Sequence, residues 1–252
     1  MNPLTFIFQK VLYQPFLNIL VVFYNLPMID FGLAIILLTI LVKAATWRLD
    51  THAILKQREA QIKGAEVQEE MKELQEKYKD DPMKQSEEIR KLWKEKKFNP
   101  FSSFAPMIVQ IVILIALFQI LRTNIGPEQL KLLYPFVKNP GEINPMFLGI
   151  INLAKASPVL AVLTGVVQFI YSKLTFSMQK KYKPKTKKKD KKKKEGTFQK
   201  VMQNQMIYFL PIFTVIICLT LPAALPLYWS LSTAVGILQT KIVYRKIEAE
   251  NK

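Results

Sequence analysis

The feature that most constrains this chain is a set of long apolar segments separated by basic ones. A transmembrane helix needs about 20 apolar residues to cross roughly 30 Å of hydrocarbon. Five segments approach this length, and they cover residues 29–47, 104–122, 158–176, 206–222 and 225–243. Prolines in the LPAALP stretch favour a tight turn between the last two segments. The pattern predicts an all-α integral membrane protein with five transmembrane helices.

Composition agrees with this class. Half of the 252 residues are hydrophobic, yet the formal net charge is +17. Because the apolar and basic residues are segregated along the chain, a membrane protein with basic loops is favoured over a soluble one. The single cysteine, Cys218, excludes an intramolecular disulfide and a cysteine-based metal site. We expect no cofactor and no bound metal.

The distribution of Lys and Arg predicts which side of the membrane each loop faces. Residues 48–99 contain 13 Lys and Arg and residues 173–200 contain 13 Lys, whereas residues 124–157 contain only three. The positive-inside rule therefore assigns both basic segments and the tail after residue 243 to the cytoplasm. The amino terminus and residues 124–157 then lie outside.

The segment before the first span admits two interpretations. Residues 6–25 are apolar, but their polar positions recur at roughly helical spacing, as in an amphipathic helix lying in the membrane interface. Those positions are Gln9, Lys10, Gln14 and Asn18. A sixth span would leave almost no turn before residue 29 and would move the basic segments outside. We predict an outer-face amphipathic helix within residues 1–28, with an extra span as the alternative.

Residues 49–100 differ from the spans because charged helix formers dominate them. Over residues 48–99 the 13 basic residues are nearly balanced by 12 acidic ones, which is typical of a solvated surface. The KDDP stretch at residues 79–82 interrupts the helical pattern. These features predict a cytoplasmic antiparallel helical hairpin.

The remaining boundaries follow from the same patterns. We predict transmembrane helices at 29–48, 101–123 and 158–176, a fourth and fifth within 204–243, an extracytoplasmic loop at 124–157, a lysine-rich cytoplasmic loop at 177–203 and a cytoplasmic tail at 244–252. The lysine-rich loop is almost free of apolar residues, so we expect no packed structure there. Its lysines can attract anionic lipid head groups or RNA phosphates, or they can act only as a topology signal. The candidates are Lys187, Lys188, Lys189, Lys191, Lys192, Lys193 and Lys194.

Polar residues inside three spans follow the spacing i, i+4, i+7, i+11 and so share one helix face. They are Thr39, Lys43, Thr46 and Asp50 on the first span; Thr164, Gln168, Tyr171 and Thr175 on the third; and Trp229, Thr233, Gly236 and Thr240 on the fifth. The second span offers Gln110. Polar stripes facing lipid are costly, so they should converge on an interior cavity or on each other. For the threonines, ordinary helix-to-helix hydrogen bonding is the alternative.

Lys43 is the unusual residue of these stripes. A lysine at the centre of a membrane helix costs about 2.5–3.5 kcal/mol, and less near an end. Lys43 lies about 7 Å from the predicted cytoplasmic end, so its side chain can snorkel toward water. No Asp or Glu lies deeper in any span. We therefore expect a cation without an intramembrane carboxylate partner, in a hydrated groove open to the cytoplasm.

The order of these segments resembles the YidC/Oxa/Alb family of membrane protein insertases over nearly the whole chain. GLAIILLTILVK resembles the family's first core span, where a basic residue, usually arginine, lines a hydrophilic groove. MFLGIINLAKAS resembles its outer loop. FNPFSSFAPMIVQIVILIALFQIL and LPAALPLYWSLSTAVGILQT resemble its second span and its final pair of spans, with matching residues at Asn99, Pro100, Gln110, Tyr228 and Trp229.

The chain also departs from the family pattern. Lys43 replaces the usual arginine, Val112 stands where a proline often follows the glutamine, and Tyr171 stands where many relatives have glutamine. Ala224 and Thr233 replace a usual glycine and asparagine. The large extracytoplasmic domain of Gram-negative members is missing, so the chain resembles a short form.

The resemblance implies an insertase and chaperone of the bacterial plasma membrane, acting without covalent chemistry on nascent membrane proteins, alone or with the Sec translocon. It implies contact of the basic loops with the ribosome, and we expect a functional monomer. The implied groove residues are Lys43, Thr39, Thr46, Gln110, Gln168, Tyr171, Tyr228, Trp229 and Thr233.

Other functions have less support in the sequence. The chain has one histidine, His52, and no nucleophile-elbow, zinc-protease or phosphate-loop motif, which disfavours an enzyme. A small-solute transporter or channel is the main alternative, but intramembrane carboxylates and broken-helix repeats are missing. A relative specialised for tail-anchored proteins or for assembly is a third possibility.

Overall fold

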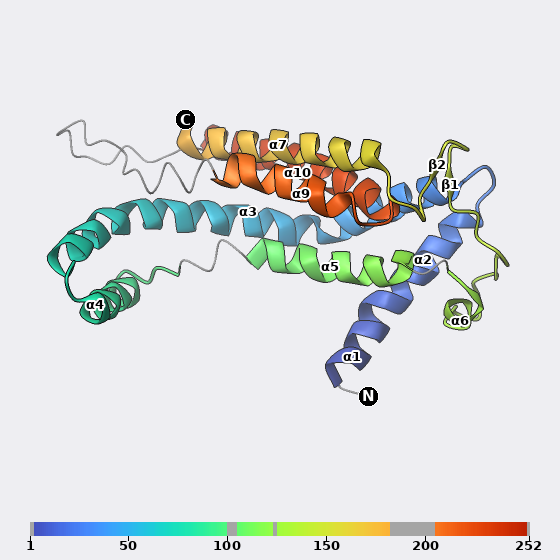
Figure 1. Ribbon diagram of the computed structural model, residues 1–252, viewed down its shortest axis with the longest axis horizontal. Coiled ribbons are helices and arrows are strands. Elements are labelled where there is room, and N and C mark those ends of the chain that lie inside the picture. Colours follow the sequence, from blue (N-terminus) through green and yellow to red (C-terminus); the bar gives the residue numbers. More distant parts are fainter. Residues whose placement is uncertain (1–2, 100–104, 123–124, 182–204, 251–252) are drawn as a thin grey trace.

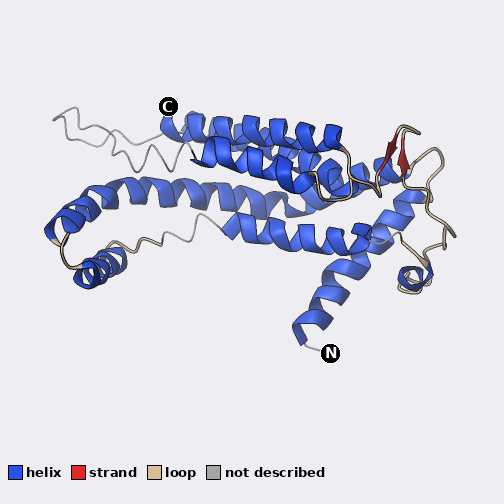
Figure 2. Cartoon of the chain, in the orientation of Figure 1, coloured by secondary structure: helices blue, strands red, loops and turns tan. Residues whose placement is uncertain are grey.

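The computed structural model describes residues 3–99, 105–122, 125–181 and 205–250. These residues form helices and one antiparallel two-stranded sheet (Figures 1 and 2). The elements are α1 (Pro3–Phe8), the π-helical η1 (Gln9–Tyr13), α2 (Gln14–Tyr24), α3 (Phe31–Lys77), α4 (Pro82–Glu95), α5 (Ala105–Arg122), α6 (Pro127–Leu130), β1 (Met146–Phe147), β2 (Ile151–Asn152), α7 (Pro158–Lys181), the π-helical η3 (Gln205–Phe209), α9 (Leu210–Cys218) and α10 (Ala224–Glu250). The prediction of an all-α architecture is confirmed.

The long helices form one bundle. α10 packs against both α7 and α3, α7 packs against α9, and α5 contacts α3 and α10 (Figure 1). The bundle buries apolar side chains between its helices and also exposes large apolar side chains on its outside, as a surface facing lipid does. Exposed examples are Ile40, Leu41, Val162, Leu163, Val166, Ile170, Ile212 and Ile216.

Three helical stretches in the described part of the chain are long and apolar enough to cross a membrane. They cover residues 6–24, 31–60 and 158–178. The apolar helical stretches at 111–121 and 207–218 are shorter. Residues 6–24 therefore have the length and composition of a span, as the alternative interpretation of the first 28 residues allowed.

α3 does not stop at residue 48, where we placed the end of the first transmembrane helix. It continues as one 47-residue helix to Lys77, so the first span and the first arm of the hairpin are a single rod. The reason is local: residues 33–63 contain neither Gly nor Pro, and both apolar and charged stretches favour helix. α4 begins at Pro82, with the Asp81 carboxylate accepting a hydrogen bond from the Lys84 amide at 3.0 Å.

α4 folds back along the end of α3. The Trp93 indole N–H donates to the Met71 sulfur at 3.3 Å, and Lys96 pairs with Glu70 at 2.7 Å. The pairing order is antiparallel, since later residues of α4 meet earlier residues of α3. Exposed charges pair within α4, where Lys91 lowers the pKa of the Glu88 carboxyl by its hydrogen bond.

The opposite end of the bundle, which we call the loop end, consists of residues 125–157 and the turn at 219–223 (Figure 1). The turn is tied to the loop because the Ala223 amide donates to the Lys155 carbonyl at 2.8 Å. Asp30 caps α3 through the Leu33 amide and also accepts from the Leu148 amide.

The first helices dock on this loop end. α2 packs against α3 and runs obliquely to the bundle (Figure 1). The Asn18 side chain is 2 % exposed; its oxygen accepts from the Tyr134 amide at 2.6 Å, and its nitrogen donates to the Leu132 carbonyl at 3.2 Å. Gln14 donates to the same carbonyl at 3.0 Å. Two of the four polar positions of this segment therefore bind the loop.

Candidate functional site

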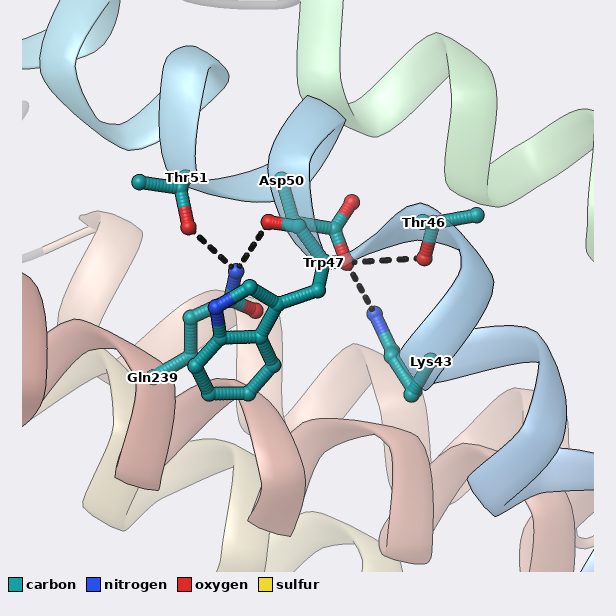
Figure 3. Close-up of polar contacts among 6 residues, drawn as sticks. All are labelled: Lys43, Thr46, Trp47, Asp50, Thr51 and Gln239. Carbon is teal, nitrogen blue, oxygen red and sulfur yellow. Dashed lines mark hydrogen bonds and ion pairs between the residues drawn. The ribbon is translucent and has the colours of Figure 1, made fainter.

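The polar stripe of α3 forms a local cluster around Asp50. The Lys43 ammonium lies 3.2 Å from Asp50 Oδ2, and the Thr46 hydroxyl donates to the same oxygen at 3.1 Å (Figure 3). The side chains of Lys43 and Asp50 are 13 % and 24 % exposed, so the pair is partly buried. This cluster joins a cation, a carboxylate and a hydroxyl on one helix face.

We expected no intramembrane carboxylate partner for Lys43, and the partner that it has, Asp50, lies beyond residue 48, the predicted end of the first span. Asp50 is two helical turns away, or about 10.5 Å along the axis. The flexible lysine side chain extends toward the carboxyl end of α3, and its ammonium meets the Asp50 carboxylate between the two backbone positions. The ammonium thus points toward the end of the bundle where α4 lies, which is also the direction of snorkelling (Figure 1).

α10 is joined to the same part of α3 by Gln239. The Gln239 amide nitrogen donates to the Trp47 carbonyl at 2.8 Å and to the Thr51 hydroxyl at 2.9 Å (Figure 3). Gln239 is 1 % exposed. Helical spacing does not single out this residue, because it lies one position off the polar stripe of the last span, although a glutamine within an apolar segment is itself a signal.

α7 contributes Tyr171 to this region. A Cβ added to Gly236 of α10 would lie 3.7 Å from the Tyr171 ring, so the two helices are close here. The Tyr171 phenol also neighbours Thr175 of its own helix and Thr240 of α10, and it lies near Asp50 of α3. The polar stripes of the first, third and last spans therefore meet at one level of the bundle.

This level contains buried hydroxyl groups beside the Tyr171 phenol. The hydroxyl oxygens of Thr175 and Thr240 are buried and lack a hydrogen bond within the described residues. Buried hydroxyls normally bind a partner, and water is the usual one where the protein supplies none. These hydroxyls add polar groups between α7 and α10 at the level of the charged pair.

The other candidates lie elsewhere in the bundle. Thr39 is fully buried and donates to the Ile35 carbonyl of its own helix at 2.7 Å. Tyr228 belongs to the apolar core at 1 % exposure, and Gln168 is buried at 8 %. Trp229 and Thr233 are partly buried. Thr39 and Tyr228 thus lie in packed surroundings.

Some candidates cannot be placed by their side chains. The backbone of Gln110 belongs to α5, but its side chain is not described. All seven candidate lysines between residues 187 and 194 lie outside the described residues. In the described part of the chain, no group of three or more His, Cys, Asp or Glu side chains could hold a metal ion.

Comparisons with known proteins agree with this architecture. A family model described as 60Kd inner membrane protein matches residues 22–251. A Clostridium tetani protein named membrane protein insertase YidC is 31 % identical over 89 % of this chain and 86 % of its own length. A Fusobacterium nucleatum protein of that name is 28 % identical over 86 % of this chain and 87 % of its own length.

A longer protein of the same name, from Haemophilus influenzae, is 29 % identical over 87 % of this chain but only 34 % of its own length. The match to the family model begins in the last turn of α2 and continues past the end of α10, and so includes the helices that carry the polar cluster. The chain therefore belongs to the 60Kd inner membrane protein family and is an all-α bacterial membrane protein.

Proposed function

We propose that this chain is a membrane protein insertase that inserts nascent membrane proteins and helps them fold. Its family membership supports this function, and relatives that match most of its length are named as insertases. The observation that carries the mechanism is a partly buried lysine in an apolar helix, at the level where three polar stripes meet. The transporter alternative finds no support in the comparisons.

The mechanism rests on lowering a desolvation cost. A polar segment of a substrate that must cross the membrane loses hydrogen bonds to water when it enters hydrocarbon, and each unpaired group costs several kcal/mol. Hydroxyls, an amide and a cation inside a groove open to the cytoplasm replace part of that hydration. The apolar segment of the substrate then moves directly into lipid.

Lys43 gives this groove a preference for acidic segments. Its ammonium attracts a substrate carboxylate more strongly in the partly buried site than it would in water. Thr46 of α3 and Tyr171 of α7 supply hydroxyl groups at this level. Gln168 of α7 and Trp229 and Thr233 of α10 are proposed to line the groove farther along the bundle. Covalent chemistry is not part of the proposal.

We propose five membrane spans, with the amino terminus outside. α4 and the carboxyl end of α10 lie at one end of the bundle, while residues 125–157 lie at the other (Figure 1). The excess of Lys and Arg at the first end assigns it to the cytoplasm. α5 and α9, with the residues that flank them, complete the five spans together with α3, α7 and α10.

Substitution of Lys43 tests the mechanism. Lys43→Arg keeps the charge and should insert substrates normally, whereas Lys43→Ala should slow insertion of substrates with acidic outer segments by about tenfold. Lys43→Glu should be slower still, because like charges repel. The measurement is protease protection of radiolabelled substrates in membrane vesicles with matched levels of each variant. Normal insertion of acidic substrates by both the Ala and Glu variants would reject the groove role of Lys43.

We also propose the ribosome, anionic lipids and the Sec translocon as partners, with contact to the first two through the lysines at 187–189 and 191–194. Neutralising these lysines with serine should weaken ribosome co-sedimentation and flatten its dependence on salt, in neutral as well as anionic lipid. An unchanged salt slope would leave these lysines as a topology signal only.

A further inference from the structure

We infer that Asp50 is a specificity-determining residue: an internal carboxylate that occupies Lys43 between substrates and must be displaced by the acidic segment of a substrate. The inference rests on the proposed insertase function and deepens it. Asp50 then sets how many acidic residues a substrate segment needs before it can bind Lys43.

The geometry gives Asp50 this position. It is the carboxylate at ion-pair distance from Lys43 in the described part of the chain, with 3.2 Å between Nζ and Oδ2. The Thr46 hydroxyl holds the same oxygen at 3.1 Å and so fixes the carboxylate toward Lys43. An entering carboxylate therefore competes with a partner that is already oriented.

The burial of the pair makes the competition matter. Ion pairs on a fully exposed surface contribute little, but attraction strengthens as water is excluded. With side-chain exposures of 13 % and 24 %, Lys43 and Asp50 lie between these limits. A neutral polar segment attracts the Lys43 ammonium less strongly than the Asp50 carboxylate does, so it leaves the ion pair intact. A segment with several carboxylates attracts the ammonium more strongly and replaces Asp50.

The displaced Asp50 carboxylate can be hydrated again near the edge of the membrane. Asp50 lies about 28 Å along α3 from Phe31, whereas Lys43 lies about 18 Å along it. With α3 entering the membrane at Phe31, Asp50 is close to the far edge of roughly 30 Å of hydrocarbon. A released Asp50 therefore regains water by a small movement toward the cytoplasm, which keeps the exchange of one carboxylate for another close to neutral in free energy.

The experiment measures insertion rates for three otherwise identical single-span substrates whose outer segments carry no, one or three aspartates. Asp50→Asn keeps the size of the side chain and an acceptor for Thr46 but removes the charge. It should raise the insertion rate of the one-aspartate substrate about three- to tenfold and should leave the neutral substrate unchanged. Asp50→Glu, the matched control, retains a carboxylate and should behave as the unmodified protein.

A double-variant cycle separates this inference from the proposed function. In the Lys43→Ala background, Asp50→Asn should have no effect on any substrate, because the cation for which Asp50 competes is gone. A gain that persists in that background would overturn the inference, as would an unchanged or slower rate for the one-aspartate substrate in the single Asp50→Asn variant.

The Lys43→Ala single variant distinguishes a failure of the Asp50 inference from a failure of the proposed role of Lys43. If it slows acidic substrates while Asp50→Asn changes nothing, the groove role of Lys43 stands and only the Asp50 inference falls. If it inserts every substrate normally, both fall. Each variant is quantified in the membrane, and Asp50→Ser replaces Asp50→Asn should the latter not accumulate.

Discussion

At the scale of single residues, Gly165 sets the distance between two helices of the bundle. Gly165 lies on α7 opposite Val215 of α9, and a Cβ added there would overlap the Val215 side chain. Its neighbour Thr164 is fully buried and donates to the Pro226 carbonyl of α10 at 3.0 Å. Small and hydroxyl-bearing residues of this kind let membrane helices approach closely and bond across their interface.

Gly165→Ala should therefore destabilise the bundle by about 1–3 kcal/mol, because the added methyl forces the helices apart. The measurement is the temperature of unfolding or aggregation of the purified protein in detergent. Gly236→Ala is the matched control, since its Cβ would make an ordinary contact at 3.7 Å with Tyr171. The double variant Gly165→Ala/Val215→Ala should recover stability, and equal stability of the two glycine variants would contradict the packing argument.

At the scale of elements, the hairpin has a small core of its own beyond the bundle. Val67 of α3 and Leu92 of α4 are 2 % and 5 % exposed. Trp93 and Met71 make a polar contact beside them, and charged side chains cover the outside. A core of this size is far smaller than that of the bundle, so the hairpin should open at a lower free energy than the bundle unfolds.

Leu92→Ala should loosen α4 by about 2 kcal/mol, at the low end for a buried leucine because the hairpin can adjust around the cavity. Hydrogen exchange of backbone amides in residues 82–95 should accelerate, while exchange in α7 and α10 should not change. Met83→Ala, at a position that is 87 % exposed, is the control. Faster exchange throughout the bundle would show that the hairpin and bundle unfold together.

At the scale of the whole molecule, the two ends of the bundle differ in charge and in backbone structure. The end with α4 carries the hairpin and the carboxyl terminus of α10, and the loop end carries the sheet and the docked α2 (Figure 1). The continuous α3 connects the ends and joins the membrane region to the hairpin in a single helix.

The orientation of this molecule can be tested with single cysteines after Cys218 is replaced. Exposed positions are Ser86 in α4, Asn139 in the loop and Ala249 near the end of α10. In intact cells an impermeant thiol reagent should label position 139, because the proposed topology puts the loop end outside, and should label the other two only after the membrane is opened. Labelling of 86 and 249 but not 139 in intact cells would reverse the orientation.

Local sequence pattern predicts the class of the whole molecule but not every feature of it. The all-α membrane class follows from the length and apolarity of the segments, and the meeting of the polar stripes follows from their helical spacing together with the cost of turning them to lipid. The number of spans stays a prediction. α5 has 18 residues, and the apolar stretch in η3 and α9 covers only residues 207–218.

What the sequence by itself determined is the content of each helix: which residues are apolar, which share a face, and where KDDP and LPAALP interrupt the helical pattern. Only the tertiary structure decided that Gln239 of α10 bonds to the backbone of α3, and that the polar side chains of α2 bind the loop end. Periodicity fixes the direction in which a side chain leaves its helix. The rotamer it adopts and the partner it meets depend on which helices pack beside it, and that is settled by non-local contacts.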